Sequence, residues 1–140
     1  MSVLSPRPSH NPITPAHAAA AIVWLDDMST RDKWDLSVEE VVDLLGGISP
    51  RTFYDWRNKA TSGQVNLSRD CLERLSLLLG ISKALQIVAP SGHLQLAYSW
   101  FNKPNDHPIF GGLSIKEYLI QRKTIEALYT VRRYLDAARG

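Results

Sequence analysis

The stretch Ser37–Ala60, SVEEVVDLLGGISPRTFYDWRNKA, decides how the first half of this chain folds. Ser37 and Glu40 form a capping box, in which the serine oxygen accepts from a helical N–H and the glutamate reaches back. The helix that begins there should end at Gly46-Gly47, because glycine takes the left-handed conformation without penalty. The serine–proline pair that follows is typical of a second helix start. Two short helices about a tight glycine turn predict a helix-turn-helix.

The second helix of this pair, expected over 50–60, has an apolar and a polar face. Phe53, Trp56 and Ala60 recur at helical spacing and should pack against the first helix. On the other face, arginine can donate two hydrogen bonds to guanine and asparagine can pair with adenine, while threonine, tyrosine and lysine commonly reach phosphates. We therefore expect this face to contact DNA; a plain solvent-facing surface is the alternative. The expected DNA-binding residues are Arg51, Thr52, Tyr54, Asp55, Arg57, Asn58 and Lys59.

Capping residues and apolar spacing predict helices along the rest of the chain. No segment alternates apolar and polar residues at period two over more than a few positions, so the predicted fold is all-α. The expected segments are a helix over 15–28, a leucine-rich helix over 68–79 closed by Gly80, a short helix over 82–88 capped by Ser82, a helix over 91–101, and a terminal helix capped by Ser114 with a break near 121–124.

The chain divides by pattern into a proline-rich flexible arm (1–14), a helix-turn-helix unit (15–66) and a C-terminal helical unit (67–140). The net charge is +2, which by itself requires no polyanionic partner. Residues 1–66 hold six Lys/Arg against eight Asp/Glu, and residues 67–140 hold ten against six. A basic half can bind nucleic acid or an acidic partner. Because the helix-turn-helix unit is weakly acidic, useful DNA affinity would require a dimer on a two-part site.

The last third of the chain, 100–140, joins an aromatic anchor and an Asn/Pro/Gly-rich loop to a long amphipathic helix. Trp100 and Phe110 flank the loop, and residues such as Asn105 favour its turns. By spacing alone, the apolar stripe of the helix favours core packing over a partner site. Basic residues flank this stripe, which consists of Ile125, Leu128, Val131 and Leu135.

The arrangement Trp100…Pro104-Asn105…Phe110-Gly111-Gly112-Leu113…Leu119, followed by a further helix, resembles the toxin-binding domain of the Xre/MbcA/ParS antitoxins. The helix-turn-helix before it is similar to that family's Xre-like N-terminal half, so the resemblance covers about residues 15–140. Two positions depart from the family pattern. Ile115 stands where the family often has proline, and Arg122-Lys123-Thr124 stands where it often has glycine.

The resemblance implies an antitoxin of a type II toxin–antitoxin system whose partner is a RES-domain toxin that consumes NAD. Such an antitoxin covers the toxin's active site with its C-terminal region, and the complex represses its own operon through the helix-turn-helix. We expect a homodimer within that complex. Arg139 and the carboxylate of Gly140 could enter a pocket that otherwise holds a charged dinucleotide; a frayed terminus is the alternative. The expected toxin-binding residues are Trp100, Asn105, Phe110, Arg132, Arg133, Arg139 and Gly140.

No residue set resembles catalytic machinery, so we expect neither an enzyme nor a metal or cofactor site. The four histidines lack metal-binding spacing, and Cys71 stands alone in the leucine-rich segment, where it should be buried and inert. The alternative to an antitoxin is a stand-alone transcription regulator whose C-terminal helices dimerise or sense a ligand.

The sequence also predicts where the protein resides. Its longest apolar run, 18–25, is too short to span a bilayer, and the beginning of the chain lacks a signal-peptide pattern. A single cysteine fits a reducing compartment. We therefore expect a cytoplasmic protein without a membrane partner.

Overall fold

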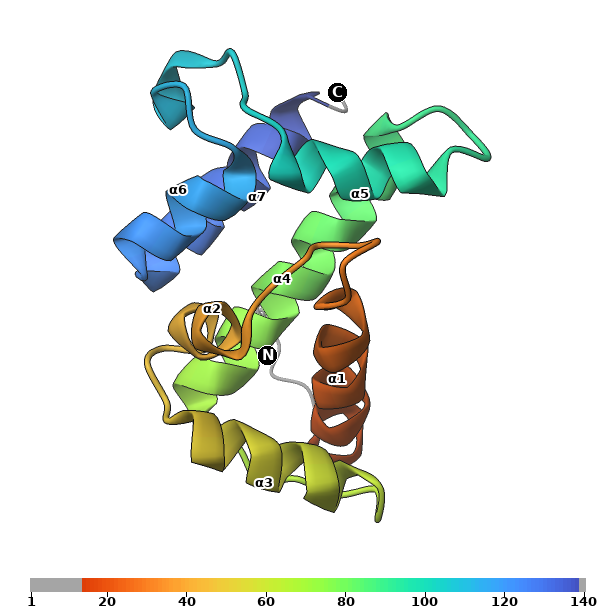
Figure 1. The fold of residues 1–140 in the computed structure, drawn as a ribbon, viewed down its shortest axis with the longest axis vertical. Coiled ribbons are helices and arrows are strands. Elements are labelled where there is room, and N and C mark those ends of the chain that lie inside the picture. Colours follow the sequence, from red (N-terminus) through yellow and green to blue (C-terminus); the bar gives the residue numbers. More distant parts are fainter. Residues whose placement is uncertain (1–13, 139–140) are drawn as a thin grey trace, which may run out of the picture.

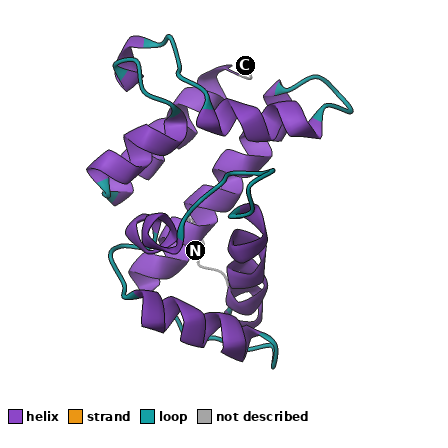
Figure 2. Ribbon diagram, in the orientation of Figure 1, coloured by secondary structure: helices purple, strands orange, loops and turns teal. Residues whose placement is uncertain are grey.

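The computed structural model describes residues 14–138, and every regular element in that range is helical (Figures 1 and 2). The prediction of an all-α fold is confirmed for these residues. The expected N-terminal arm lies outside them, except for Thr14. The elements are α1 (Pro15–Met28), α2 (Val38–Leu44), α3 (Pro50–Ala60), α4 (Arg69–Val88), α5 (Leu94–Asn102), the 3-10 turn η2 (Pro108–Phe110), α6 (Ile115–Arg122) and α7 (Ile125–Ala138).

Helix α4 runs through the middle of the molecule, with α1, α2 and α3 around its first half and α5, α6 and α7 around its second half (Figure 1). Buried apolar side chains from both halves form one cluster. None of the described helices is long and apolar enough to cross a membrane.

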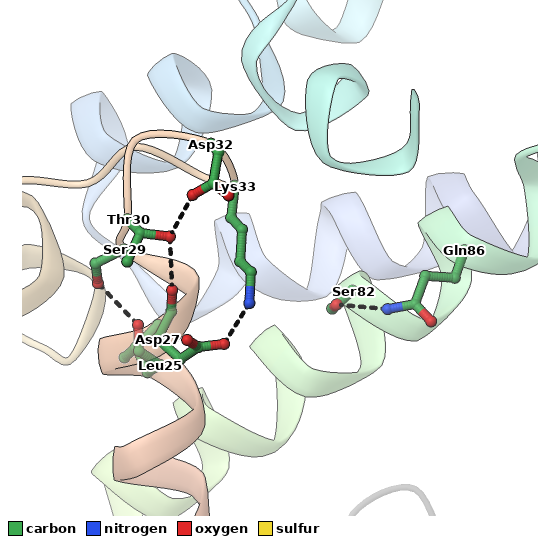
Figure 3. A network of polar contacts seen from close by, with 8 residues as sticks. All are labelled: Leu25, Asp27, Ser29, Thr30, Asp32, Lys33, Ser82 and Gln86. Atoms are coloured by element: carbon green, nitrogen blue, oxygen red, sulfur yellow. Dashed lines mark hydrogen bonds and ion pairs between the residues drawn. The ribbon is translucent and has the colours of Figure 1, made fainter. Parts of the chain in front are cut away.

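The predicted break inside this central helix is wrong, because α4 is continuous from Arg69 to Val88. Gly80 lies inside it, and a Cβ there would come within 1.6 Å of a guanidinium nitrogen of Arg132 on α7. The glycine therefore makes room for a crossing side chain and does not end the helix. Ser82, expected as a cap, is buried, and its Oγ accepts a 3.4 Å hydrogen bond from the amide of Gln86 (Figure 3).

The loop after α1 ties the two halves together through Trp34. This side chain is 1% exposed and stacks on Phe101 of α5, with ring centroids 4.0 Å apart and an interplanar angle of 12°. Trp24 of α1 meets the Trp34 ring edge-on at 5.6 Å. Aromatic side chains bury large areas and contribute correspondingly to stability, so this stack fixes α1 relative to α5.

Side-chain hydrogen bonds hold the same loop in shape (Figure 3). Ser29 Oγ donates to the Leu25 carbonyl at 2.8 Å, and Thr30 Oγ1 donates to the Asp27 carbonyl at 3.0 Å. Lys33 forms an ion pair with the Asp27 carboxylate, and this contact raises the pKa of the lysine. From α6, Lys116 Nζ donates to the Asp35 carbonyl at 3.0 Å. The loop is thus fastened both to its own helix and to the second half of the molecule.

The caps predicted for three helices are confirmed. Ser37 and Glu40 form the capping box of α2, and Ser49 Oγ accepts from the Thr52 N–H at the start of α3. Ser114 and Glu117 form a second capping box at the start of α6.

Left-handed backbone follows both α2 and α6. Gly46 and Gly47 follow α2 with φ of 98° and 85°, as the sequence predicted. The break expected near 121–124 is also confirmed, since Lys123 separates α6 from α7 with φ 59° and ψ 14°. We call residues 45–49 the α2–α3 turn and residues 122–124 the α6–α7 joint.

Candidate functional site

The exposed face of α3 carries most of the residues expected to contact DNA. Phe53 and Ala60 are buried, as predicted, and leave the polar side of the helix open. The structure brings five of the seven expected residues together around a shallow depression of about 430 Å³. They are Arg51, Thr52, Tyr54, Asp55 and Asn58.

The other two expected DNA-binding residues already have partners within the chain. Arg57 Nη1 donates to Asp26 Oδ1 of α1 at 3.3 Å, and its guanidinium lies 5.0 Å from the centre of the Tyr54 ring. Lys59 forms a 3.1 Å ion pair with Asp55, one helical turn earlier. Such partly exposed pairs contribute little free energy, so either cation can exchange its carboxylate for another anion.

A second concave surface lies at the opposite end of the molecule from α3. This groove, of about 720 Å³, runs between the ends of α4 and α5, the loop 103–107 and the last turns of α7. Trp100 and Asn105, both expected to contact a toxin, line it. The remaining lining residues are Leu85, Val88, Lys103, Pro104, Asp106, His107, Ile115, Tyr134, Leu135 and Ala138.

Phe110, the other aromatic residue expected at a toxin contact besides Trp100, supports this groove from inside. It is 1% exposed and meets the rings of Tyr118 and Tyr134 edge-on, at centroid distances of 5.2 and 5.1 Å. His107 packs on the same Tyr134 ring at 4.9 Å. The loop is therefore held against α7 by an aromatic cluster.

Hydrogen bonds complete the wall of the groove. Asn105 Oδ1 accepts from the backbone N–H of His107 at 2.8 Å, and Asn105 Nδ2 donates to the Tyr134 hydroxyl at 3.4 Å. The Asn105 N–H donates to the Leu113 carbonyl at 3.0 Å, next to an isolated bridge between Pro104 and Ser114. Asn105 thus joins the two ends of the loop to α7.

The basic residues expected on α7 differ in their exposure and in their contacts within the chain. Arg132 Nε donates to both carboxylate oxygens of Asp136, at 3.2 and 3.1 Å, and its guanidinium lies over Gly80. It therefore holds α7 against α4. Arg133 is exposed, with a 3.4 Å contact to Thr130 Oγ1. Arg139 and Gly140 lie outside the described residues.

Sequence reasoning did not assign most of the groove's lining residues to a toxin contact, among them Lys103, His107 and Tyr134. Lys103 and His107 lie in the loop and show no local pattern that would single them out. Tyr134 follows Arg133 on a helix whose aliphatic stripe carried the prediction. Its position one helical turn beyond Thr130 and next to Leu135 could have marked it as a residue at the edge of the buried face.

The described residues offer no alternative chemistry at either surface. Between residues 14 and 138, no group of three or more His, Cys, Asp and Glu side chains is placed to hold a metal ion. Cys71 is buried, as predicted; its Sγ donates to the Leu45 carbonyl at 3.2 Å, and burial raises the pKa of the thiol. A thiol is unreactive unless it ionises, so Cys71 belongs to the packing.

Comparison with known proteins bears on the second concave surface. Residues 84–140 match the family of the antitoxin Xre/MbcA/ParS C-terminal toxin-binding domain, a range that contains every residue lining the groove. The "Uncharacterized protein y4oB" of Sinorhizobium fredii (strain NBRC 101917 / NGR234) is 37% identical over 109 residues, which are 78% of each chain. No solved structure matches the chain.

The molecule is thus a helical binding protein with a toxin-binding domain at its C-terminal end. Residues 84–140 form the C-terminal toxin-binding domain of the Xre/MbcA/ParS antitoxin family, which implies an antitoxin, a non-enzymatic role, within a toxin–antitoxin system.

The structure also explains one departure from the family pattern. Glycine is often found where this chain has Arg122-Lys123-Thr124, and Lys123 adopts the left-handed conformation that glycine takes without penalty. The helix break is therefore retained although the glycine is not. At the other departure, Ile115 takes the first helical position of α6 and is 1% exposed.

Proposed function

We propose that the chain neutralises a RES-domain, NAD-consuming toxin of a type II toxin–antitoxin system by covering its active site with residues at and beyond the groove. The observation that carries this proposal is that a groove of about 720 Å³ lies entirely within the matched toxin-binding domain. Its wall combines apolar side chains with a few polar ones, as at protein-binding anchor pockets.

In this proposal, the residues of the groove have different roles. Trp100 and Asn105 contact the toxin directly, and the buried Phe110 keeps the loop in place. Helix α7 reaches the groove at Ala138, so the next residues of the chain, Arg139 and Gly140, follow directly from it. A guanidinium suits a pocket whose other occupant carries phosphates, because arginine binds phosphate through paired hydrogen bonds.

Coexpression with the toxin tests this function. The full chain should restore growth and copurify with the toxin, whereas Trp100→Ala and deletion of residues 137–140 should weaken both. Truncating an aromatic anchor at an interface typically costs about 2 kcal/mol or more, or about 30-fold in Kd. Lys83→Ala, an exposed lysine on α4, is the matched control. Full neutralisation by the deletion variant would show that the last residues do not enter the toxin.

We further propose that α2 and α3 are a DNA-binding helix-turn-helix that represses the operon, with α3 as the recognition helix. The exposed cluster of Arg51, Thr52, Tyr54, Asp55 and Asn58 supports this proposal. It contains an arginine and an asparagine about two helical turns apart, and these are the side chains that read guanine and adenine edges. A homodimer would place two such helices on a two-part operator.

Operator binding tests the second proposal. Arg51→Ala and Asn58→Ala should each weaken binding by about 1–3 kcal/mol, because a bidentate base contact is worth that much. Arg31→Ala is the charge-matched control, since Arg31 lies in the loop that follows α1 and is not part of α3. Unchanged affinity for both α3 variants in a gel-shift assay would rule out α3 as the recognition helix.

The groove also favours one alternative, a stand-alone regulator that senses a small molecule. Apolar walls with a few placed polar groups are typical of ligand sites. Purification from the native host separates the two functions: an antitoxin copurifies with its toxin, whereas a ligand-sensing regulator does not.

A further inference from the structure

A buried arginine connects the two halves of the molecule. Arg74, on the first half of α4, is 9% exposed. Its Nε donates to Asp70 Oδ2 at 2.9 Å, and its Nη1 donates to the Lys123 carbonyl at 3.2 Å. A guanidinium buried to this extent must keep its hydrogen-bond partners, because an unpaired buried charge is strongly destabilising. Its position therefore depends on where the α6–α7 joint lies.

The joint also contacts α2 directly, through the side chain of Lys123. While its carbonyl accepts from Arg74, its Nζ lies 3.7 Å from Asp43 Oδ2 on α2. Lys123 does so in a left-handed conformation that costs free energy for a residue with a Cβ. Strained backbone persists where the surrounding structure over-determines it, and it is a pointer to function.

On the other side, the same arginine supports the turn that leads into α3. A Cβ on Gly46 would lie 2.9 Å from Asp70 Oδ2 and 3.2 Å from Arg74 Nε. The backbone of the α2–α3 turn thus passes directly against the Asp70–Arg74 pair. Four residues after Gly46, α3 begins at Pro50. A shift of Arg74 therefore acts on the segment that sets the direction of α3.

We infer that Arg74 is a positioning residue through which a toxin bound to the C-terminal domain changes the DNA affinity of α3. Movement of the α6–α7 joint displaces the Lys123 carbonyl, Arg74 follows to keep its hydrogen bond, and the α2–α3 turn adjusts. Because binding free energies are linked, operator DNA changes toxin affinity by the same factor. This inference rests on the proposed function, since it requires both toxin and operator binding.

The test measures the Kd of the full chain for operator DNA by fluorescence anisotropy, without toxin and with saturating toxin. The ratio of the two values is the coupling factor. For the unmodified chain it should differ from one by at least about fivefold, the lower end of typical allosteric coupling. In Arg74→Lys, which keeps the charge but cannot bridge Asp70 and the Lys123 carbonyl together, it should fall below about twofold.

A second variant keeps the test decisive if Arg74→Lys does not fold. Lys123→Gly retains the left-handed joint and the carbonyl but loses the ammonium contact to Asp43, so the coupling factor should fall to a value between those of the unmodified chain and Arg74→Lys. Lys83→Ala, on the same helix, should leave it unchanged. If Arg74 had a purely structural role, its substitution would weaken DNA binding and toxin binding but would leave the coupling factor unchanged.

The outcomes separate the inference from the function beneath it. A coupling factor near one in the unmodified chain, or equal factors in all variants, overturns the inference while toxin and operator binding stand. Failure of the unmodified chain to bind toxin or operator overturns the proposed function and the inference with it.

Discussion

The α2–α3 turn and the α6–α7 joint use the same left-handed backbone but different residues. The turn uses Gly46 and Gly47, at φ 98° and 85°, and the joint uses Lys123, at φ 59°. For a residue with a Cβ this conformation costs roughly 1–2 kcal/mol. The chain avoids that cost at the turn and accepts it at the joint.

Space explains the difference. A Cβ on Gly46 would meet Asp70 and Arg74, whereas one on Gly47 would meet nothing within 4 Å. At Gly46, glycine is therefore required by both conformation and close approach. Lys123 is exposed, and its side chain extends to Asp43. A residue other than glycine is therefore tolerated at a left-handed position where its side chain has room and a partner.

The two glycines of the turn give the largest expected effect. Gly46→Ala should lower the free energy of unfolding by about 2–3 kcal/mol, because the new Cβ both strains the backbone and displaces Arg74. Gly47→Ala should cost about 1 kcal/mol, from strain alone. Urea denaturation of both variants measures the difference. Equal losses would show that the close approach of Arg74 to the turn does not matter for stability.

Substitution of Lys123 should have a smaller effect. Lys123→Gly removes the strain and an exposed ion pair, whereas Lys123→Ala removes only the ion pair. The glycine variant should therefore be more stable than the alanine variant by about 1 kcal/mol. Thermal unfolding of the two proteins side by side checks this, and an alanine variant as stable as the glycine variant would mean that the joint is not left-handed in solution.

A third glycine sharpens the comparison, because Gly80 is helical and serves only to make space. In the unmodified chain, Gly80→Ala displaces Arg132, which offsets the gain in helix propensity. In an Arg132→Ala background the same substitution should stabilise the protein by about 1 kcal/mol. A double-mutant cycle measures this coupling. Additive effects would show that the guanidinium does not lie over Gly80.

What could be predicted from the sequence was local. The caps at Ser37, Ser49 and Ser114 lie within three residues of the N–H groups that they satisfy, and the break near Lys123 follows from the end of one apolar pattern and the start of another. Gly80 and Ser82 misled the prediction of α4, because a glycine that makes room for a distant arginine has the same local pattern as one that ends a helix.

The groove could not be predicted in the same way. The groove residues Trp100 and Tyr134 lie 34 positions apart in the sequence. Contacts of Phe110, His107 and Asn105 with Tyr134 bring the loop to α7. The contact of Arg74 with Lys123 spans 49 positions. The family resemblance indicated the toxin-binding domain, but the surface itself required the fold.

Hydrogen exchange of the full chain, with and without its toxin, tests the central claim most directly. Amides of the loop 103–107 and of the last turns of α7 should become protected when toxin binds, because the groove is the contact surface. The exposed face of α3 should remain unprotected, apart from any change transmitted to the α2–α3 turn. Protection confined to α1 and α3, with none around Trp100 and Asn105, would contradict the claim that toxin binds at the groove.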